Sequence, residues 1–244
     1  VFSDTREIFF DEDLDEFFIA SYFMEEESNE SFLKEGLISY YKLDETSGDV
    51  IDSHGQHNGA NHGATRGVSG KIENAFDFDG SDSYVDTIPA EDIPSVITVS
   101  MWVYPTGTGQ VWGSVDVAHG GKDGYISNYD GSGESVAFRY YKDNAVFGSF
   151  ITHPHSVPLN EWSFLTYTVN ASNAAAIYVN GVEQAASTFG TSPTDHDRTL
   201  MLGKSINSQH QAFDGKIDEV GVWYRVLNAT EINMLYNRGD GWTY

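Results

Sequence analysis

The sequence contains no cysteine, few basic residues and no long apolar run. Among its 244 residues, 37 are acidic and 13 are Lys or Arg, which gives a formal net charge of −24. Without cysteine the chain has no disulfide, no thiolate metal site and no thiol nucleophile. The acid excess disfavours nucleic acid as a partner, because a phosphate backbone is bound by Lys and Arg. With no run of about 18 apolar residues, the sequence offers no candidate membrane-spanning helix.

Residues 1–35 differ in composition from the rest of the chain, with twelve acidic residues against two basic ones. Aromatic side chains are interleaved with these acids. Five apolar residues recur at the spacing of one helix face, which predicts an acidic aromatic N-terminal arm: Phe10, Leu14, Phe17, Phe18 and Tyr22. Such a stripe needs an apolar surface to cover it. The arm packs on its own domain, docks on a neighbouring subunit, or remains a solvated acidic tail.

From Gly36 onward, short runs rich in Val, Ile, Tyr, Phe and Trp alternate with clusters of Gly, Asp, Asn and Ser. This pattern is typical of strands joined by tight turns. The expected strands are 37–43, 75–78, 84–86, 97–104, 110–116, 124–129, 135–140, 146–151, 162–170, 175–179, 182–186, 199–202 and 212–224. Asn180-Gly181 predicts a hairpin turn, since both residues tolerate positive φ.

One helix is expected near the C-terminus, over residues 229–237. Asn228 and Glu231 have the spacing of a capping box, and Ile232 and Leu235 begin an apolar stripe. A dozen short strands without intervening helices favour a two-sheet antiparallel sandwich. The sequence therefore predicts an all-β domain with one short C-terminal helix.

Seven segments occur in an order and spacing that match the motifs of one family. They are 36–45 (GLISYYKLDE), 50–59 (VIDSHGQHNG), 75–85 (AFDFDGSDSYV), 98–105 (TVSMWVYP), 161–162 (EW), 177–181 (IYVNG) and 214–227 (DGKIDEVGVWYRVL). Together they resemble the laminin G-like, concanavalin A-like lectin/glucanase jelly-roll family over roughly residues 36–238. The resemblance implies a two-sheet jelly-roll domain over residues 36–244, and it does not include the arm over residues 1–35.

Polysaccharide-cleaving members of this superfamily carry Glu-X-Asp-X-(X)-Glu on one strand face for double displacement. Asp77-Phe78-Asp79 lacks the third acid, and the acids of residues 11–16 lie outside the sandwich. Asp218 and Glu219 are adjacent, so regular alternation would place them on opposite faces of a strand. The sequence therefore predicts no catalytic residues and a protein that is not an enzyme.

A structural calcium site is expected between two elements of the fold. The loop over residues 52–59 contains Asp52 and Asn58, whose oxygens suit a hard cation. In many relatives of the family, a structural calcium ion lies between this loop and the terminal strand, which implies Asp218 as a third ligand. The alternative is a turn held by side-chain to backbone hydrogen bonds.

Five aromatic residues are candidates for a sugar-stacking surface on exposed loops, because sugars place their C–H faces on such rings: Trp112, Tyr125, Tyr129, Tyr140 and Tyr141. Core packing is the alternative for each of them. Our prediction is a non-catalytic glycan-binding or adhesion module at an extracellular, cell-surface or virion surface. The second hypothesis is a structural subunit of a filament or virion, assembled through the arm with neighbouring subunits as partners in a homo-oligomer or filament.

Overall fold

The computed structural model describes residues 31–114, 123–142, 145–190, 199–204, 212–242 and 244. The chain divides into two compact units, Val1–Glu35 and Gly36–Tyr244. The five arm residues predicted to be buried, Phe10, Leu14, Phe17, Phe18 and Tyr22, lie outside the described residues. The second unit contains all the candidate binding and metal residues.

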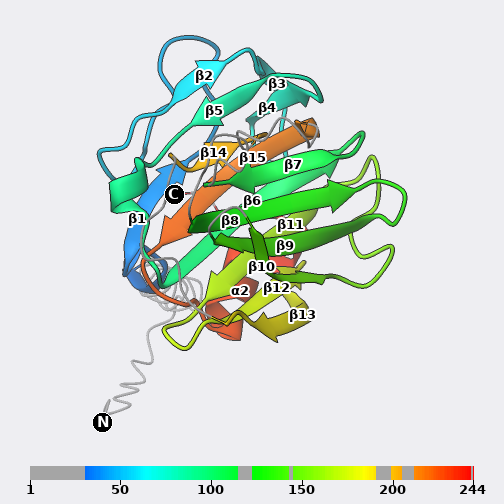
Figure 1. Cartoon of the computed structure of the whole chain (residues 1–244). Helices are drawn as coiled ribbons and strands as arrows, with labels where there is room; N and C mark the ends of the chain where they lie inside the picture. Colours follow the sequence, from blue (N-terminus) through cyan, green and yellow to red (C-terminus); the bar gives the residue numbers. More distant parts are fainter. Residues whose placement is uncertain (1–30, 115–122, 143–144, 191–198, 205–211, 243) are drawn as a thin grey trace, which may run out of the picture. The chain divides into compact units, whose positions relative to one another are not determined.

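The strands of the second unit form two antiparallel sheets in two layers (Figure 1). The first sheet has the order β13-β12-β11-β6-β15-β4-β3, and β1 also pairs with β15. Its strands are β1 (Leu37–Tyr41), β3 (Thr65–Ser69), β4 (Asn74–Asp79), β6 (Ile97–Pro105), β11 (Ser163–Val169), β12 (Ala174–Val179), β13 (Val182–Thr188) and β15 (Asp214–Trp223).

The second sheet has the order β10-β9-β8-β7-β14-β5-β2. Its strands are β2 (Ala60–His62), β5 (Tyr84–Asp86), β7 (Gly109–Gly113), β8 (Asp123–Asp130), β9 (Ser135–Lys142), β10 (Ala145–Ile151) and β14 (Met201–Leu202). The predicted all-β antiparallel sandwich is therefore confirmed.

The core lies between the two sheets and follows the alternation of the strands. On β6, Ile97, Val99, Met101 and Val103 are buried in the central apolar cluster. Burial of one such side chain contributes about 1.5–3 kcal/mol, so a strand with four of them is held firmly against the opposite sheet. Residues of the second sheet that belong to the same apolar cluster face inward, and their neighbours along each strand face outward.

The local signals at the hairpin and the helix are also confirmed. Asn180 and Gly181 join β12 to β13 with φ values of 51° and 79°. The helix α2 (Ala229–Tyr236) begins at Asn228, whose side chain accepts hydrogen bonds from the amides of Thr230 and Glu231. Two short 3-10 helices, η1 (Ala90–Asp92) and η2 (Asn237–Gly239), complete the described elements.

Two strands, β2 and β3, were not expected from the sequence. Their sequences, Ala-Asn-His and Thr-Arg-Gly-Val-Ser, are short and polar, and their residues are half-buried or exposed. Each lies at the edge of its sheet. Edge strands need no continuous apolar face, so the pattern that identifies central strands is absent from them.

Candidate functional site

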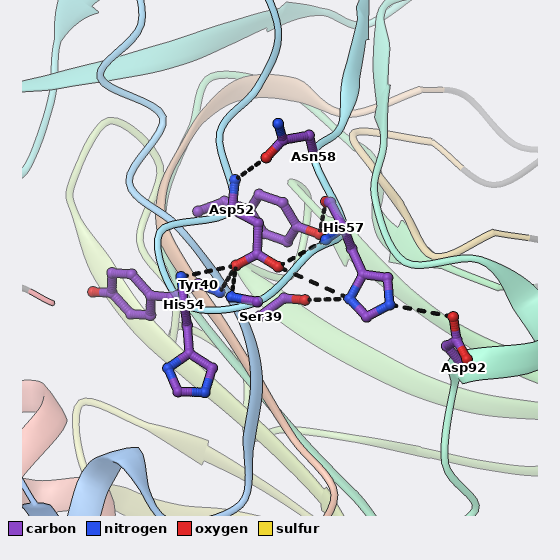
Figure 2. Close-up of polar contacts among 9 residues, drawn as sticks. Ser39, Tyr40, Asp52, His54, His57, Asn58 and Asp92 are labelled. Atoms are coloured by element: carbon purple, nitrogen blue, oxygen red, sulfur yellow. Dashed lines mark hydrogen bonds and ion pairs between the residues drawn. The ribbon is translucent and has the colours of Figure 1, made fainter.

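The predicted metal loop is organised around the carboxylate of Asp52 (Figure 2). Its Oδ1 accepts hydrogen bonds from the amides of Tyr40 at 3.0 Å, His54 at 3.1 Å and Gly55 at 2.9 Å. Its Oδ2 accepts from the amide of His57 at 3.1 Å. Burial alone would raise the pKa of Asp52, but the amides of Gly55, Tyr40 and His57 favour the ionised form and hold the pKa below its usual value.

Asn58 and Asp218, the other two predicted calcium ligands, also accept main-chain hydrogen bonds. Asn58 Oδ1 accepts from the amide of Asp52 at 3.0 Å, so both loop residues receive N–H donors. Asp218 Oδ2 accepts from the amides of Lys71 and Ile72 at 2.9 and 3.0 Å, a different segment of the chain. No group of three or more His, Cys, Asp or Glu side chains in the described part of the chain is arranged to hold a metal ion. These contacts are those of the alternative, a turn held by side-chain to backbone hydrogen bonds, and calcium stays a prediction from the sequence.

A serine, a histidine and an aspartate lie in a row beside this loop. Ser39 Oγ is 3.0 Å from His57 Nδ1, and His57 Nε2 is 3.2 Å from Asp92 Oδ2 (Figure 2). The order resembles that of a nucleophilic relay, but Ser39 is fully buried on β1 and no substrate carbonyl can reach it. The three side chains connect β1 to η1 through the loop, so their role is structural.

Two adjacent acids are buried on β15, where a β-bulge interrupts the pairing between Asp218 and Gly221. The Tyr40 hydroxyl contacts Glu219 Oε2, and the second oxygens of both acids have no hydrogen-bond partner among the residues that the structure describes. Burial, together with the nearby Asp44 carboxylate, raises the pKa of Asp218 to about 7. Burial, with the charges of Asp218 and Asp44, raises the pKa of Glu219 to about 8. The regular alternation assumed from the sequence is interrupted here by the bulge, at which Glu219 has a φ of 50°.

The five aromatic residues predicted to form an exposed sugar-stacking surface lie in strands of the second sheet and are buried. Their exposed fractions run from 0% to 6%: Trp112, Tyr125, Tyr129, Tyr140 and Tyr141. The ring of Phe138 contacts Trp112 and Tyr125 in the core. The expectation that these rings are exposed on loops is wrong, because strand alternation turns four of them toward the opposite sheet.

Tyr141 differs from the other four aromatic residues, because its side chain lies on the outer face of the sheet and not in the core between the sheets. Cross-strand pairs share a face, and the pairing of β8, β9 and β10 defines three rows of three residues. The rows are Asn128–Ala137–Ile151, Ile126–Arg139–Ser149 and Gly124–Tyr141–Val146. We call these nine residues the β8–β10 outer face. Figure 1 shows the three strands side by side in the green part of the chain.

Arg139 occupies the middle of the β8–β10 outer face. It is half-buried, and its Nη1 donates a hydrogen bond to Asn128 Oδ1 at 2.7 Å. The β10 side of the face is open, with Val146 and Ile151 exposed at 52% and 53% and Ser149 also exposed. The exposed β10 side thus offers a hydroxyl and apolar surface next to the half-buried Arg139 and Asn128, whereas Gly124, Ile126, Ala137 and Tyr141 of the same face are buried.

Sequence reasoning missed Arg139, Asn128 and Ser149 as site residues, although a signal for them was present. The expected strand 135–140 contains one charged residue between Phe138 and Tyr140. Because neighbours along a strand point to opposite faces, Arg139 marks the outer face and the two rings mark the core.

A hollow of about 470 Å³ lies on the other sheet, along β11, β12 and β13. Its lining is mostly small or hydroxylated: Thr168, Asn170, Ala174, Ala175, Ala176, Tyr178, Glu183, Ala186, Ser187, Thr188 and Val226. The Tyr178 hydroxyl contacts Glu183 Oε2 at 3.2 Å. This hollow is the second surface to be compared with the β8–β10 outer face.

The chain belongs to the concanavalin A-like lectin/glucanases superfamily, whose model matches residues 79–233. This match covers more than half of the chain and confirms the resemblance seen in its motifs. No curated protein shows significant sequence similarity to the chain.

Three solved structures illustrate the similarity of fold. The binding domain of Paraclostridial Mosquitocidal Protein 1 matches with a TM-score of 0.67 and 18% identity, over 84% of this chain and 52% of that one. The botulinum neurotoxin serotype D binding domain matches with a TM-score of 0.65 and 16% identity, over 86% and 52%. This chain thus spans about half the length of these toxin domains.

The third structure is domain 4 of AbnA, a GH43 extracellular arabinanase from Geobacillus stearothermophilus, solved in complex with arabinotriose. It matches with a TM-score of 0.60 and 21% identity, over 81% of this chain and 97% of that one. At these identities the likeness establishes the fold, which is that of a lectin-like jelly-roll domain.

Proposed function

We propose that the jelly-roll domain is a non-catalytic glycan-binding module, and that a glycan binds on the β8–β10 outer face. The observation that carries the proposal is the hydrogen-bonded pair of Arg139 and Asn128 at the centre of an otherwise uncharged, partly exposed sheet face. Sugars present hydroxyls and apolar C–H surfaces together, so a glycan site needs both polar groups and apolar contacts.

The chemistry of the face suits this class of ligand. Asn128 and Ser149 supply a side-chain amide and a hydroxyl, while the exposed side chains of Val146 and Ile151 supply apolar contact area. Among the similar structures, the arabinanase domain was solved with arabinotriose and the two toxin domains are described as binding domains. These descriptions support a binding role for the present domain.

The absence of catalysis is part of the proposal. Retaining and inverting glycosidases need two carboxyl groups that flank a scissile bond. The adjacent acids with raised pKa values, Asp218 and Glu219, are both buried and out of reach of a polysaccharide. A binding role therefore accounts for the described residues better than hydrolysis does.

An extracellular or surface location, with a role in adhesion, is proposed from the family and from the extracellular arabinanase that contains a similar domain. No helix in the part of the chain that the structure describes is long and apolar enough to span a membrane. Assembly through the arm, and calcium as a structural ion, stay predictions from the sequence. Light scattering on the full chain and melting curves with a chelator test them.

The glycan proposal is tested with two matched variants on edge strands of the two sheets. Ser149→Trp places a large ring on the β8–β10 outer face, whereas Ser187→Trp places the same ring in the hollow on β13. Both serines are exposed, so both variants should fold, and circular dichroism checks this. On a glycan array followed by titration, we expect Ser149→Trp to lose binding by about tenfold or more and Ser187→Trp to bind like the wild type.

The opposite pattern would move the site to the hollow on β11–β13. Equal binding by both variants would exclude both surfaces. A wild-type chain that binds no glycan on the array, or in titrations at millimolar concentration, would refute the proposed function itself.

A further inference from the structure

Arg139 is surrounded on its own face by uncharged residues. Its cross-strand neighbours are Ile126 and Ser149, and its neighbours two positions along β9 are Ala137 and Tyr141. The four diagonal positions are occupied by Gly124, Asn128, Val146 and Ile151. In a chain with 37 acidic residues, none of the eight positions around this arginine carries an acid.

No carboxylate among the described residues lies within ion-pair distance of Arg139. Arg225 provides a contrast in the same domain, since its guanidinium contacts Glu231 at 2.7 Å. A guanidinium remains charged at all physiological pH values, and partial burial removes part of its hydration. A half-buried arginine that has no counter-ion among the described residues is therefore favourable for an anion supplied by a ligand.

Asn128 orients this guanidinium. Its Oδ1 accepts from Nη1 of Arg139 at 2.7 Å and so restrains the plane of the group. A guanidinium has five N–H donors, and this contact uses one of them. The planar fork of arginine matches the two oxygens of a carboxylate, which it binds through two parallel hydrogen bonds.

We propose that Arg139 recognises the carboxylate of a sugar acid, so that the β8–β10 outer face selects acidic glycans over their neutral counterparts. This inference rests on the proposed function and names the class of glycan. The ligand carries few charges, because the face offers one cation and the whole chain has a net charge of −24. A densely charged polyanion would meet repulsion that a single arginine cannot offset.

The test uses two matched pairs of sugars, 3′-sialyllactose against lactose and trigalacturonate against its methyl ester. Titration at pH 7 and 0.15 M salt measures the dissociation constant of each sugar for the full chain. We expect the wild type to bind the acidic member about tenfold tighter than the neutral one in at least one pair. Arg139→Met keeps the apolar stem and should remove this preference, and Arg139→Lys should keep part of it.

Arg238→Met is the matched control, because Arg238 is exposed on η2, which belongs to neither sheet, and its substitution changes the net charge by the same amount. It should bind like the wild type, and melting curves verify that each variant is folded. If Arg139→Met does not fold, the comparison of Arg139→Lys with the wild type still tests the proposal, because the lysine variant should keep only part of the preference for the acidic sugar.

The outcomes separate the two proposals. If Ser149→Trp abolishes binding but Arg139→Met and Arg139→Lys bind both members of each pair like the wild type, the glycan site stands and the acid-binding role of Arg139 is overturned. A wild type that prefers the neutral sugars overturns it as well. Equal affinity for 6-sulfolactose and 3′-sialyllactose would refute the assignment of a carboxylate. Binding of none of these sugars, or of any glycan on the array, refutes the proposed function.

Discussion

Replacing Asp52 with alanine should destabilise the jelly-roll domain, with or without calcium present. The substitution removes the acceptor for the amides of Tyr40, His54, Gly55 and His57. The Tyr40 amide belongs to the buried strand β1, so it cannot turn to water when its acceptor is lost. An unsatisfied buried donor costs about 1–3 kcal/mol.

The other three amides lie in a partly exposed loop and can be rehydrated, so each contributes less. A total of about 3–5 kcal/mol follows, which is a large effect for a single substitution. For a domain of this size, about 1 kcal/mol corresponds to about 2–4 °C in Tm, so we expect the Tm to fall by roughly 6–20 °C. Circular dichroism melts at pH 7 measure the change.

Asp49→Ala is the matched control, because Asp49 is an exposed acid in the preceding turn. The folded-state pKa of Asp52 lies below its usual value, so its contribution is present above the unfolded pKa of about 3.9 and is lost as the pH falls through the folded pKa. The reasoning fails if Asp52→Ala shifts the Tm no more than Asp49→Ala does. A loss seen only when calcium is present would instead support the ion.

Two further predictions concern buried groups. The raised pKa values of Asp218 and Glu219 mean that the folded state binds more protons than the unfolded state between about pH 4 and 8. The free energy of unfolding from urea titrations should therefore fall as the pH rises through this window, and Asp218→Asn with Glu219→Gln should flatten the curve; an equally steep curve in the double variant would contradict this assignment. Gly203→Ala places a Cβ 2.1 Å from the ring of Phe78 at a φ of 78°, whereas Gly48→Ala has a similar φ of 81° and no atom within 4 Å. Thermal melts should show a clearly larger loss for Gly203→Ala, and similar losses would mean that backbone conformation, not the clash, sets the cost.

Local patterns predicted most of the fold, because strands, the hairpin and the helix cap depend on neighbours in sequence. The alternation of Ile97, Val99, Met101 and Val103 is sufficient to define β6 and its inward face. The polar edge strands β2 and β3 could not be found in this way. Their pairing partners, rather than their own apolar pattern, make them strands.

The site was harder to predict, because it depends on which face of a strand is turned outward. Tyr140 and Tyr141 are adjacent aromatic residues, and composition alone cannot tell which of them belongs to the core. The structure gives Tyr140 to the core and Tyr141 to the outer face. The charged side chain of Arg139 resolves this choice, since it must avoid the core and thereby fixes the direction of its neighbours.

The partners of the buried acids were also beyond local reasoning. The main-chain donor to Asp52 from β1 is twelve residues away, and the contact between Tyr40 and Glu219 joins residues 179 apart. The bulge at Asp218 breaks the period of two on which the sequence argument relied. The contact between Tyr40 and Glu219 follows from the pairing of β1 with β15, which only the folded chain defines.

The net charge and the position of Arg139 together restrict the ligand more than either does alone. At physiological salt, exposed charges act over about 8 Å, so most of the negative surface is screened from a ligand bound at one arginine. A small sugar acid reaches the guanidinium within hydrogen-bond distance and presents little charge elsewhere. A long polyanion would extend beyond the β8–β10 outer face and meet the general repulsion of a chain with a net charge of −24. In the proposed site, the same excess of acid that disfavours nucleic acid should favour a glycan with one or a few carboxylates, because only short-range attraction at Arg139 opposes the repulsion.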